Sequence, residues 1–195
     1  MSGLRQRGFS IIELLITVSI IAILMALAAP SAGNWIQNTQ LRNAAESVAS
    51  GINMARLEAL KRNQVIGFEL SDANSTAWRV CIYDVVNNVC NIAQPDIHVK
   101  GASEGGVNAR VGAETVLTGL LTALPVGDGV PGMVAFDAFG RLATTAPNNI
   151  IRVDVRNPIM DPAEERRLVI LIAVGGQVRM CDPLLPKATN PQGCV

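Results

Sequence analysis

One apolar run near the N-terminus is long enough to cross a bilayer, and it contains a single charge. Residues 9–29 are apolar or small apart from Glu13. A helix of about 20 such residues spans the hydrocarbon core of a membrane. An ionised carboxylate inside that core costs about 2.5–3.5 kcal/mol on insertion scales. We therefore expect Glu13 to have a cationic partner, and the run itself contains no Lys, Arg or His.

The basic residues around the run predict its orientation. Arg5 and Arg7 precede it, and no basic residue follows until Arg42. Because basic flanks stay on the cytoplasmic side, we predict a single-pass anchor with residues 1–8 in the cytoplasm. A cleavable secretory signal is the alternative, since residues 26–28 read Ala-Leu-Ala. The run is longer than the usual signal core of about 7–15 residues, which favours the anchor.

A cut between Gly8 and Phe9 supplies the cation that Glu13 needs. The new α-amino group of Phe9 then lies four residues from Glu13, which is one helical turn. A carboxylate in the first turn is also favoured by the helix dipole. The pair closes either within one chain or between neighbouring chains, and only the second arrangement makes this charge an assembly device.

The stretch from Arg7 to Pro30 resembles the leader and N-terminal segment of type IV pilins and type II secretion pseudopilins. The shared features are a short basic leader, a glycine before an aromatic residue, and a glutamate at the fifth position after the cut. The resemblance implies that a prepilin peptidase cleaves after Gly8 and methylates Phe9. It also implies that Glu13 pairs with the terminal amine of an adjacent subunit, while residues 14–29 pack in the filament core.

Residues 30–62 show the pattern of an amphipathic helix. Pro30 predicts a kink or a short break at its start. Apolar residues at steps of three and four then form one stripe that can rest on a folded domain. The stripe consists of Leu41, Ala45, Val48, Ile52, Ala55 and Ala59. Asn63 predicts the helix end, and we interpret Arg56 and Glu58 as solvated charges.

Residues 63–195 predict a β-rich head. Residues 64–70, 77–83 and 151–156 have the composition of strands, and the last of these alternates as a half-buried strand does. The pair Gly175-Gly176 indicates a hairpin with a two-residue turn. Residues 101–132 read as loops with one or two strands. The expected fold class is α+β, a long N-terminal helix packed on an antiparallel β-sheet.

Four cysteines form two couples along the chain. Cys81 and Cys90 flank turn-forming residues, and Cys181 and Cys194 enclose a proline-containing tail. We predict two disulfides in an oxidising compartment, since no CxxC pair indicates zinc. Loops of this size gain about 2–3 kcal/mol from closure. Free buried thiols are the alternative.

The chain lacks the residues of common catalytic sites. His98 is the only histidine, so neither a Ser-His-Asp triad nor a multi-histidine metal site can form from this chain alone. No glycine-rich strand-to-helix pattern indicates a phosphate site. We predict that the protein is not an enzyme and has neither cofactor nor metal.

Three stretches of the chain resemble the GspH/FimT branch of the pilin-like proteins, namely residues 53–70, 134–142 and 179–183. The resemblance implies a minor pilin of a type IV pilus that acts in pilus assembly with other minor pilins and the major pilin. It implies anchoring in the bacterial inner membrane with a periplasmic head, and later incorporation into a pilus or pseudopilus. Pseudopilin H of a type II secretion system is an alternative that the sequence leaves open.

DNA binding is another alternative. In the FimT subgroup, which takes part in DNA uptake, a Gly-Arg-x-Arg element near the C-terminus contributes to DNA binding. This chain has Gly176-Gln177-Val178-Arg179, which keeps one of the two arginines. Clustered positive charge supports nonspecific binding to phosphates. The candidate residues are Gln177, Arg179, Arg166, Arg167 and Lys187, with Arg152 and Arg156 beside them, and ordinary strand-surface charges are the alternative interpretation.

Overall fold

The computed structural model describes residues 9–104 and 106–194, and for residues 26–32 and 103 it describes the backbone alone. The chain divides into two compact units, the first ending at Ile36 and the second comprising Gln37–Val195. The predicted leader, residues 1–8, lies outside the described residues.

One helix, α1, occupies Ile11–Arg62. The sequence predicts a kink or a short break at Pro30. The short break is wrong, since the helical backbone continues through that residue, and the kink stays a prediction. A proline removes one backbone donor, and the remaining hydrogen bonds of the helix persist on either side. The helix ends where the sequence predicted. Asn63 has a φ of 53°, the left-handed conformation that commonly terminates helices.

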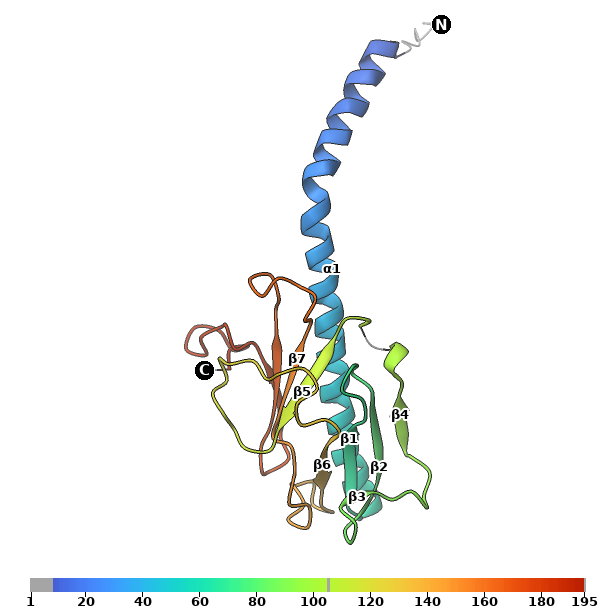
Figure 1. The fold of residues 1–195 in the computed structure, drawn as a ribbon, viewed down its shortest axis with the longest axis vertical. Helices are drawn as coiled ribbons and strands as arrows, with labels where there is room; N and C mark the ends of the chain where they lie inside the picture. The colour runs from blue at the N-terminus through green and yellow to red at the C-terminus, as the bar shows by residue number, and fades with distance from the viewer. Residues whose placement is uncertain (1–8, 105, 195) are drawn as a thin grey trace, which may run out of the picture. The chain divides into compact units, whose positions relative to one another are not determined.

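The rest of the second unit is built from two antiparallel sheets, which Figure 1 shows around the C-terminal half of α1. The first sheet contains β1 (Ile66–Leu70), β2 (Trp78–Asp84), β3 (Val89–Cys90), β4 (His98–Lys100) and β6 (Gly132–Phe136), in the order β3-β2-β1-β6 with β4 also beside β2. The second contains β5 (Arg110–Glu114), β7 (Arg152–Arg156), β8 (Leu168–Ile172) and β9 (Val178–Cys181), in the order β5-β7-β8-β9. A 3₁₀ turn, η1 (Ala102–Glu104), lies between β4 and β5. The α+β prediction is confirmed.

The predicted apolar stripe of α1 forms the centre of the core. All six of its residues are at most 1% exposed. They pack against Phe68 and Val80 of the first sheet and against Val153 and Ile170 of the second. Gly51 permits the close approach of helix and sheet, because a Cβ atom there would lie 2.7 Å from Cε2 of Phe68. One helix therefore holds both sheets together.

The predicted hairpin between β8 and β9 is confirmed, but its turn differs from the prediction. Of the two glycines only Gly176 has a positive φ, 80°. The amide of Gly176 donates to the carbonyl of Ala173 at 2.7 Å, and the amide of Ala173 donates to the carbonyl of Gln177 at 2.9 Å. The loop thus has three residues, a type I turn followed by one left-handed residue.

Candidate functional site

The N-terminal part of α1 exposes apolar side chains on every side. From residue 9 to residue 25 the large apolar residues are each at least 50% exposed, namely Phe9, Ile11, Ile12, Leu14, Leu15, Ile16, Val18, Ile20, Ile21, Ile23, Leu24 and Met25. They occupy positions all round the helix, so no polar face is left for water. An exposed apolar surface of this length marks a site that lipid or other helices cover.

Glu13 lies in the first turn of α1, as predicted, and its side chain is exposed. The nearby hydroxyls are satisfied by the helix itself, since Thr17 donates to the carbonyl of Leu14 at 2.9 Å and Ser19 donates to that of Leu15 at 2.7 Å. Glu13 is the single charged residue between positions 9 and 41. Its predicted pairing with a processed Phe9 stays a prediction, because Gly8 lies outside the described residues. No helix in the described part of the chain is both long and apolar enough to cross a membrane.

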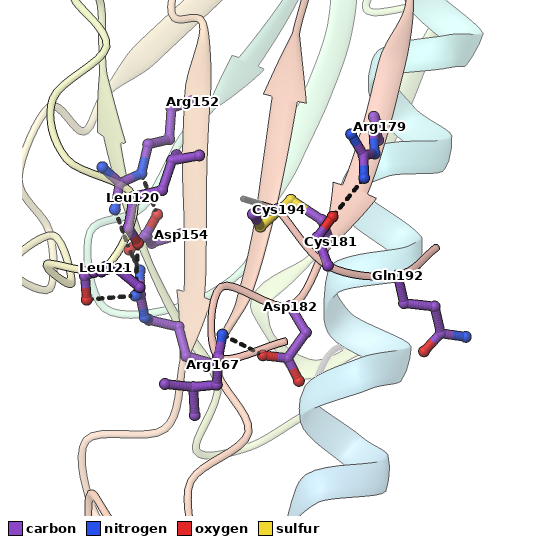
Figure 2. Close-up of a disulfide and its surroundings, with 12 residues drawn as sticks. Leu120, Leu121, Arg152, Asp154, Arg167, Arg179, Cys181, Asp182, Gln192 and Cys194 are labelled. Atoms are coloured by element: carbon purple, nitrogen blue, oxygen red, sulfur yellow. Dashed lines mark hydrogen bonds and ion pairs between the residues drawn. A yellow bond between two sulfur atoms is a disulfide. The ribbon is translucent and has the colours of Figure 1, made fainter. Parts of the chain in front are cut away.

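Both predicted cysteine couples are disulfides in the structure. Cys81 and Cys90 join β2 to β3, with Cα atoms 5.5 Å apart. Cys181 and Cys194 close the C-terminal tail, with Cα atoms 5.0 Å apart (Figure 2). The tail is also tied by its backbone, since the amide of Asp182 donates to the carbonyl of Gln192 at 2.8 Å. The tail is therefore held to the end of β9 by covalent and backbone bonds.

Arg179, the arginine retained from the predicted DNA-binding element, contacts this tail. Its Nη2 donates to the carbonyl oxygens of Gly193 and Pro191, and Figure 2 shows it beside the disulfide. Its guanidinium therefore supports the tail. Gln177, at the second position of the element, is exposed.

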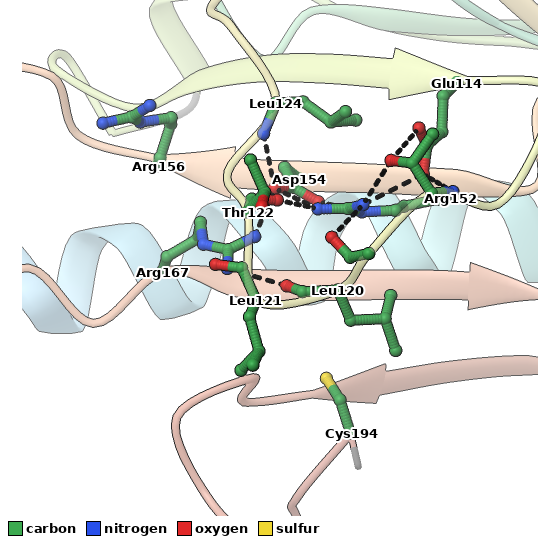
Figure 3. Close-up of polar contacts among 12 residues, drawn as sticks. Glu114, Leu120, Leu121, Thr122, Leu124, Arg152, Asp154, Arg156, Arg167 and Cys194 are labelled. Carbon is green, nitrogen blue, oxygen red and sulfur yellow. Dashed lines mark hydrogen bonds and ion pairs between the residues drawn. The ribbon is translucent and has the colours of Figure 1, made fainter.

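A buried cluster of charges occupies the face of the second sheet that carries Arg152 and Asp154 (Figure 3). Nε of Arg152 lies 2.7 Å from Oδ1 of Asp154, and neither side chain is exposed. Nη1 of Arg152 lies 2.9 Å from Oε1 of Glu114. Arg167 approaches Asp154 from the start of β8. The prediction that β7 is half-buried, with Arg152 and Asp154 on its wet side, is wrong.

The loop that follows β5 covers this cluster and supplies the remaining hydrogen-bond partners. Arg152 donates to the carbonyl of Thr122 at 2.7 Å, and Arg167 donates to the carbonyls of Leu120 and Leu121 at 2.9 and 3.0 Å. The amide of Leu124 donates to Asp154 at 3.0 Å. Buried charges are tolerated when they are paired and hydrogen-bonded in this way. The cluster therefore fixes the loop on the sheet.

The charges of the cluster favour its ionised state. Burial raises the pKa of Glu114, but hydrogen bonds from the side chain and amide of Thr118 and from Arg152 outweigh it, so the pKa lies below its usual value. Burial lowers the pKa of Arg152, and the contacts with Asp154 and Glu114 reverse this and raise the pKa.

The other predicted DNA-binding residues differ in their exposure to solvent. Arg167 is 7% exposed and belongs to the buried cluster, so its predicted phosphate-facing position is wrong. Arg166 and Lys187 are exposed. DNA binding stays a prediction that depends on these two residues, on Gln177 and on the half-buried Arg179.

A groove of about 330 Å³ lies beside the tail. Its walls come from the C-terminal half of α1, from β8 and β9, and from the tail itself, and its lining residues are Asn38, Arg42, Arg166, Leu168, Met180, Cys181, Asp182, Leu185 and Gln192. Asn38 fixes the segment before β8, because its Nδ2 donates to the carbonyl of Glu164 and its Oδ1 accepts from the amide of Arg166, both at 2.9 Å.

Arg56 and Glu58 behave differently from each other. Glu58 binds Lys61 and Arg62 on the surface of α1, at 3.2 and 2.6 Å. Arg56 is half-buried and donates through Nε to the carbonyl of Gly140 at 2.9 Å. Arg56 therefore ties the helix to the loop after β6.

Within residues 9–104 and 106–194, no group of three or more His, Cys, Asp or Glu side chains could hold a metal ion.

Two family models match this chain. A family model described as "Type II transport protein GspH" matches residues 44–176, and one described as "Prokaryotic N-terminal methylation motif" matches residues 3–29. The chain is 35% identical over 65 residues to pilin-like protein PilA1 of Thermus thermophilus, a match that spans 33% of this chain and 40% of that protein. Two crystal structures of the type IV minor pilin FimU of Pseudomonas aeruginosa are 17% identical to it. They have TM-scores of 0.46 and 0.49, and the matches cover 79% and 83% of this chain and 99% of each FimU chain.

Proposed function

The chain belongs to the family of the type II transport protein GspH and carries the N-terminal methylation motif, and from this premise we propose that it is a minor pilin of a type IV pilus. A prepilin peptidase cleaves it after Gly8 and methylates Phe9. The protein is anchored in the inner membrane by residues 9–29, with its head in the periplasm. It then joins other minor pilins and the major pilin through α1 and acts in pilus assembly.

The observation that carries this proposal is the exposed apolar surface of α1 with one carboxylate in its first turn. Leu14, Ile23 and Leu24 are 56%, 62% and 61% exposed, which is the surface of a helix that packs against lipid and then against other helices. Glu13 gives that surface one position where a charge must be matched. Because an unmatched carboxylate is costly in an apolar setting, the pair with an amine fixes how far neighbouring helices slide past one another.

The head supports a structural role. One disulfide fixes its tail, the other joins β2 to β3, and the buried charge cluster fixes its longest loop. Pilin and pseudopilin families are structural proteins rather than enzymes.

A pseudopilin of a type II secretion system is the second candidate, because the matched family model is described as a type II transport protein. The two machines use the same N-terminal chemistry, so the filament that contains the protein distinguishes them. Recovery in sheared pili favours the first candidate, and loss of protein export without loss of pili on deletion favours the second.

Substitution of Glu13 tests the proposal. Glu13→Ala should insert in the membrane and be cleaved as before, but its amount in sheared pili should fall about tenfold or more, since about 1.4 kcal/mol corresponds to a factor of ten. Glu46→Ala is the matched control, because Glu46 is an exposed acid on the same helix, paired with Arg42 at 2.9 Å. Equal recovery of Glu13→Ala and Glu46→Ala in pili would count against the assembly role.

A further inference from the structure

A second exposed apolar surface lies in the head, at the C-terminal end of α1. It consists of Leu57, Leu60, Phe139 and Val174, which are 63%, 45%, 74% and 78% exposed. We call these four residues the Phe139 patch. The other phenylalanines of the head, Phe68 and Phe136, are fully buried, so Phe139 is exceptional in its exposure.

Three separate segments converge to form the Phe139 patch. The helix contacts the loop after β6, because a Cβ atom on Gly140 would lie 3.3 Å from both terminal carbons of Leu60. That loop contacts the β8–β9 hairpin, since a Cβ atom on Gly176 would lie 1.9 Å from the carbonyl oxygen of Gly140. The amide of Leu142 also donates to the carbonyl of Val174 at 3.1 Å. The three segments that carry the four exposed apolar residues therefore lie against one another.

The loop that carries Phe139 is fixed by its own hydrogen bonds. Oδ1 of Asp137 accepts from the amides of Phe139 and Arg141, both at 2.9 Å. The amide of Asp137 donates to the carbonyl of Arg141 at 2.8 Å. The Arg141 guanidinium lies 5.2 Å from the centroid of the Phe139 ring. A side chain held in this way loses little conformational entropy when a partner binds.

Cations outnumber carboxylates around the Phe139 patch. The segments that form it, residues 56–62, 137–142 and 173–177, contain four cations and two carboxylates, namely Arg56, Lys61, Arg62, Arg141, Glu58 and Asp137. Glu58 pairs with both Lys61 and Arg62, and Asp137 pairs with Arg141. An apolar centre with an aromatic residue and a polar rim is the anatomy of a protein interface. Three of the four cations share these two carboxylates, so the surface keeps a small excess of positive charge. That excess suits an acidic protein surface better than a nucleic acid, which is bound through many unpaired cations.

We propose that the Phe139 patch docks the head of a different pilin subunit, through an apolar surface with acidic residues at its margin. A second copy of this chain that used the same patch would bring the same excess of positive charge against itself, and complementary charge favours the right partner over the wrong one. This inference rests on the proposed function, since it takes the partner to be another filament subunit.

Photo-crosslinking from position 139 tests the inference. The full-length chain would carry p-benzoylphenylalanine in place of Phe139, in its native membrane, and the adducts would be identified by mass spectrometry. The control carries the same group in place of Ile92, which is 93% exposed on a different loop. We expect position 139, and not position 92, to give an adduct with another protein that has an N-terminal methylation motif, at a peptide rich in apolar and acidic residues. Adducts with a second copy of this chain only, adducts with DNA, or no adduct would overturn the inference.

A matched pair of substitutions gives an independent readout. Phe139→Ala should lower co-recovery of the crosslinked partner about tenfold, because a few aromatic anchors carry most of the binding energy of an interface, and Ile92→Ala should leave it unchanged. Equal co-recovery from both would overturn the inference. This experiment and the Glu13 experiment test different claims, so either can fail alone. If the protein never enters pili but position 139 still crosslinks a pilin-like partner in the membrane, the pilus assignment fails and the patch stands.

Discussion

Arg152 and Asp154 project from the same face of β7 and form an ion pair of 2.7 Å, with neither side chain exposed to solvent. Two residues apart on a strand, they point to one side, and the loop after β5 covers that side. The pair therefore fixes the long loop after β5 at one position on the second sheet. Arg167, the residue before β8, joins this pair, and Glu114 of the neighbouring strand β5 completes the cluster.

Removal of the charge of Asp154 should destabilise the head strongly. Asp154→Asn leaves Arg152 and Arg167 buried without their shared carboxylate, and breaking a buried pair typically costs about 3–5 kcal/mol. The free energy of unfolding of the fragment Gln37–Val195, measured in urea, checks this. Glu46→Gln is the control, because its exposed pair with Arg42 should contribute about 0–1 kcal/mol. A loss at Asp154 no larger than at Glu46 would show that the cluster does not hold the loop.

The sequence predicted the helix stripe, both disulfides and the hairpin because each has a local signal. Val48 and Ile52 follow a helical period, and Cys81 and Cys90 flank a turn. It did not predict the burial of Arg152, because alternation along β7 shows only that the residue faces away from the helix core. Whether that second face meets water depends on residues 119–124, whose main-chain carbonyls accept from the arginines. Backbone carbonyls have no sequence signature.

The exposure of Phe139 also has no local signal in the sequence. The stretch 134–142 resembles the GspH/FimT branch, yet nothing in it distinguishes a buried Phe136 from an exposed Phe139. Strand pairing makes the distinction, since Phe136 pairs with Ile66 inside the first sheet, whereas Phe139 lies in the loop beyond. The burial of Arg167 did have one signal in the sequence. The apolar run Leu168 to Ile172 follows this residue directly.

Acid should weaken the head through Glu114. Its folded-state pKa lies below the ordinary carboxyl value of 4.5, so the unfolded state binds protons first as pH falls. The stabilisation from Glu114 is then present above about pH 4.5 and is lost as pH falls through the lower folded-state pKa. We expect the free energy of unfolding of Gln37–Val195 to fall with pH in this range.

The variant Glu114→Gln isolates this contribution. It should be less stable than the parent at neutral pH, and its stability should depend less steeply on pH below the 4.5 of the free side chain. Identical slopes for parent and variant would assign the acid sensitivity to other carboxylates.

The tail disulfide should matter for the tail more than for the core. Replacing Cys181 and Cys194 with serine opens a loop with a sequence separation of 13 residues and should cost about 2–3 kcal/mol. Since Arg179 also binds the tail carbonyls, limited proteolysis should cut residues 183–192 first while the sheet stays intact. Simultaneous loss of tail and sheet, read by circular dichroism, would contradict this order.

Arg166 and Arg167 should respond differently to the same substitution. Arg167→Ala should lower stability, because it leaves Asp154 short of one partner, whereas Arg166→Ala removes an exposed side chain and should change stability by less than about 0.5 kcal/mol. Only Arg166→Ala can therefore report on DNA binding, through a salt-dependent mobility shift of the full-length protein. The opposite result would be that Arg167→Ala keeps full stability and weakens the mobility shift at low salt, while Arg166→Ala does not. Arg167 would then leave its buried position when DNA binds.

The mature chain should begin at Phe9, because only a cut after Gly8 places an ammonium four residues before Glu13. Mass spectrometry of protein from native membranes should find an N-terminal peptide that starts at Phe9 and carries one methyl group. Gly8→Glu puts a bulky charged residue at the cut and should leave the chain uncleaved in the membrane, at normal abundance. That variant retains Glu13 but never gains its amine, so it should be absent from pili just as Glu13→Ala is. A Gly8→Glu chain that remains uncleaved and still enters pili would show that assembly does not need the new terminus.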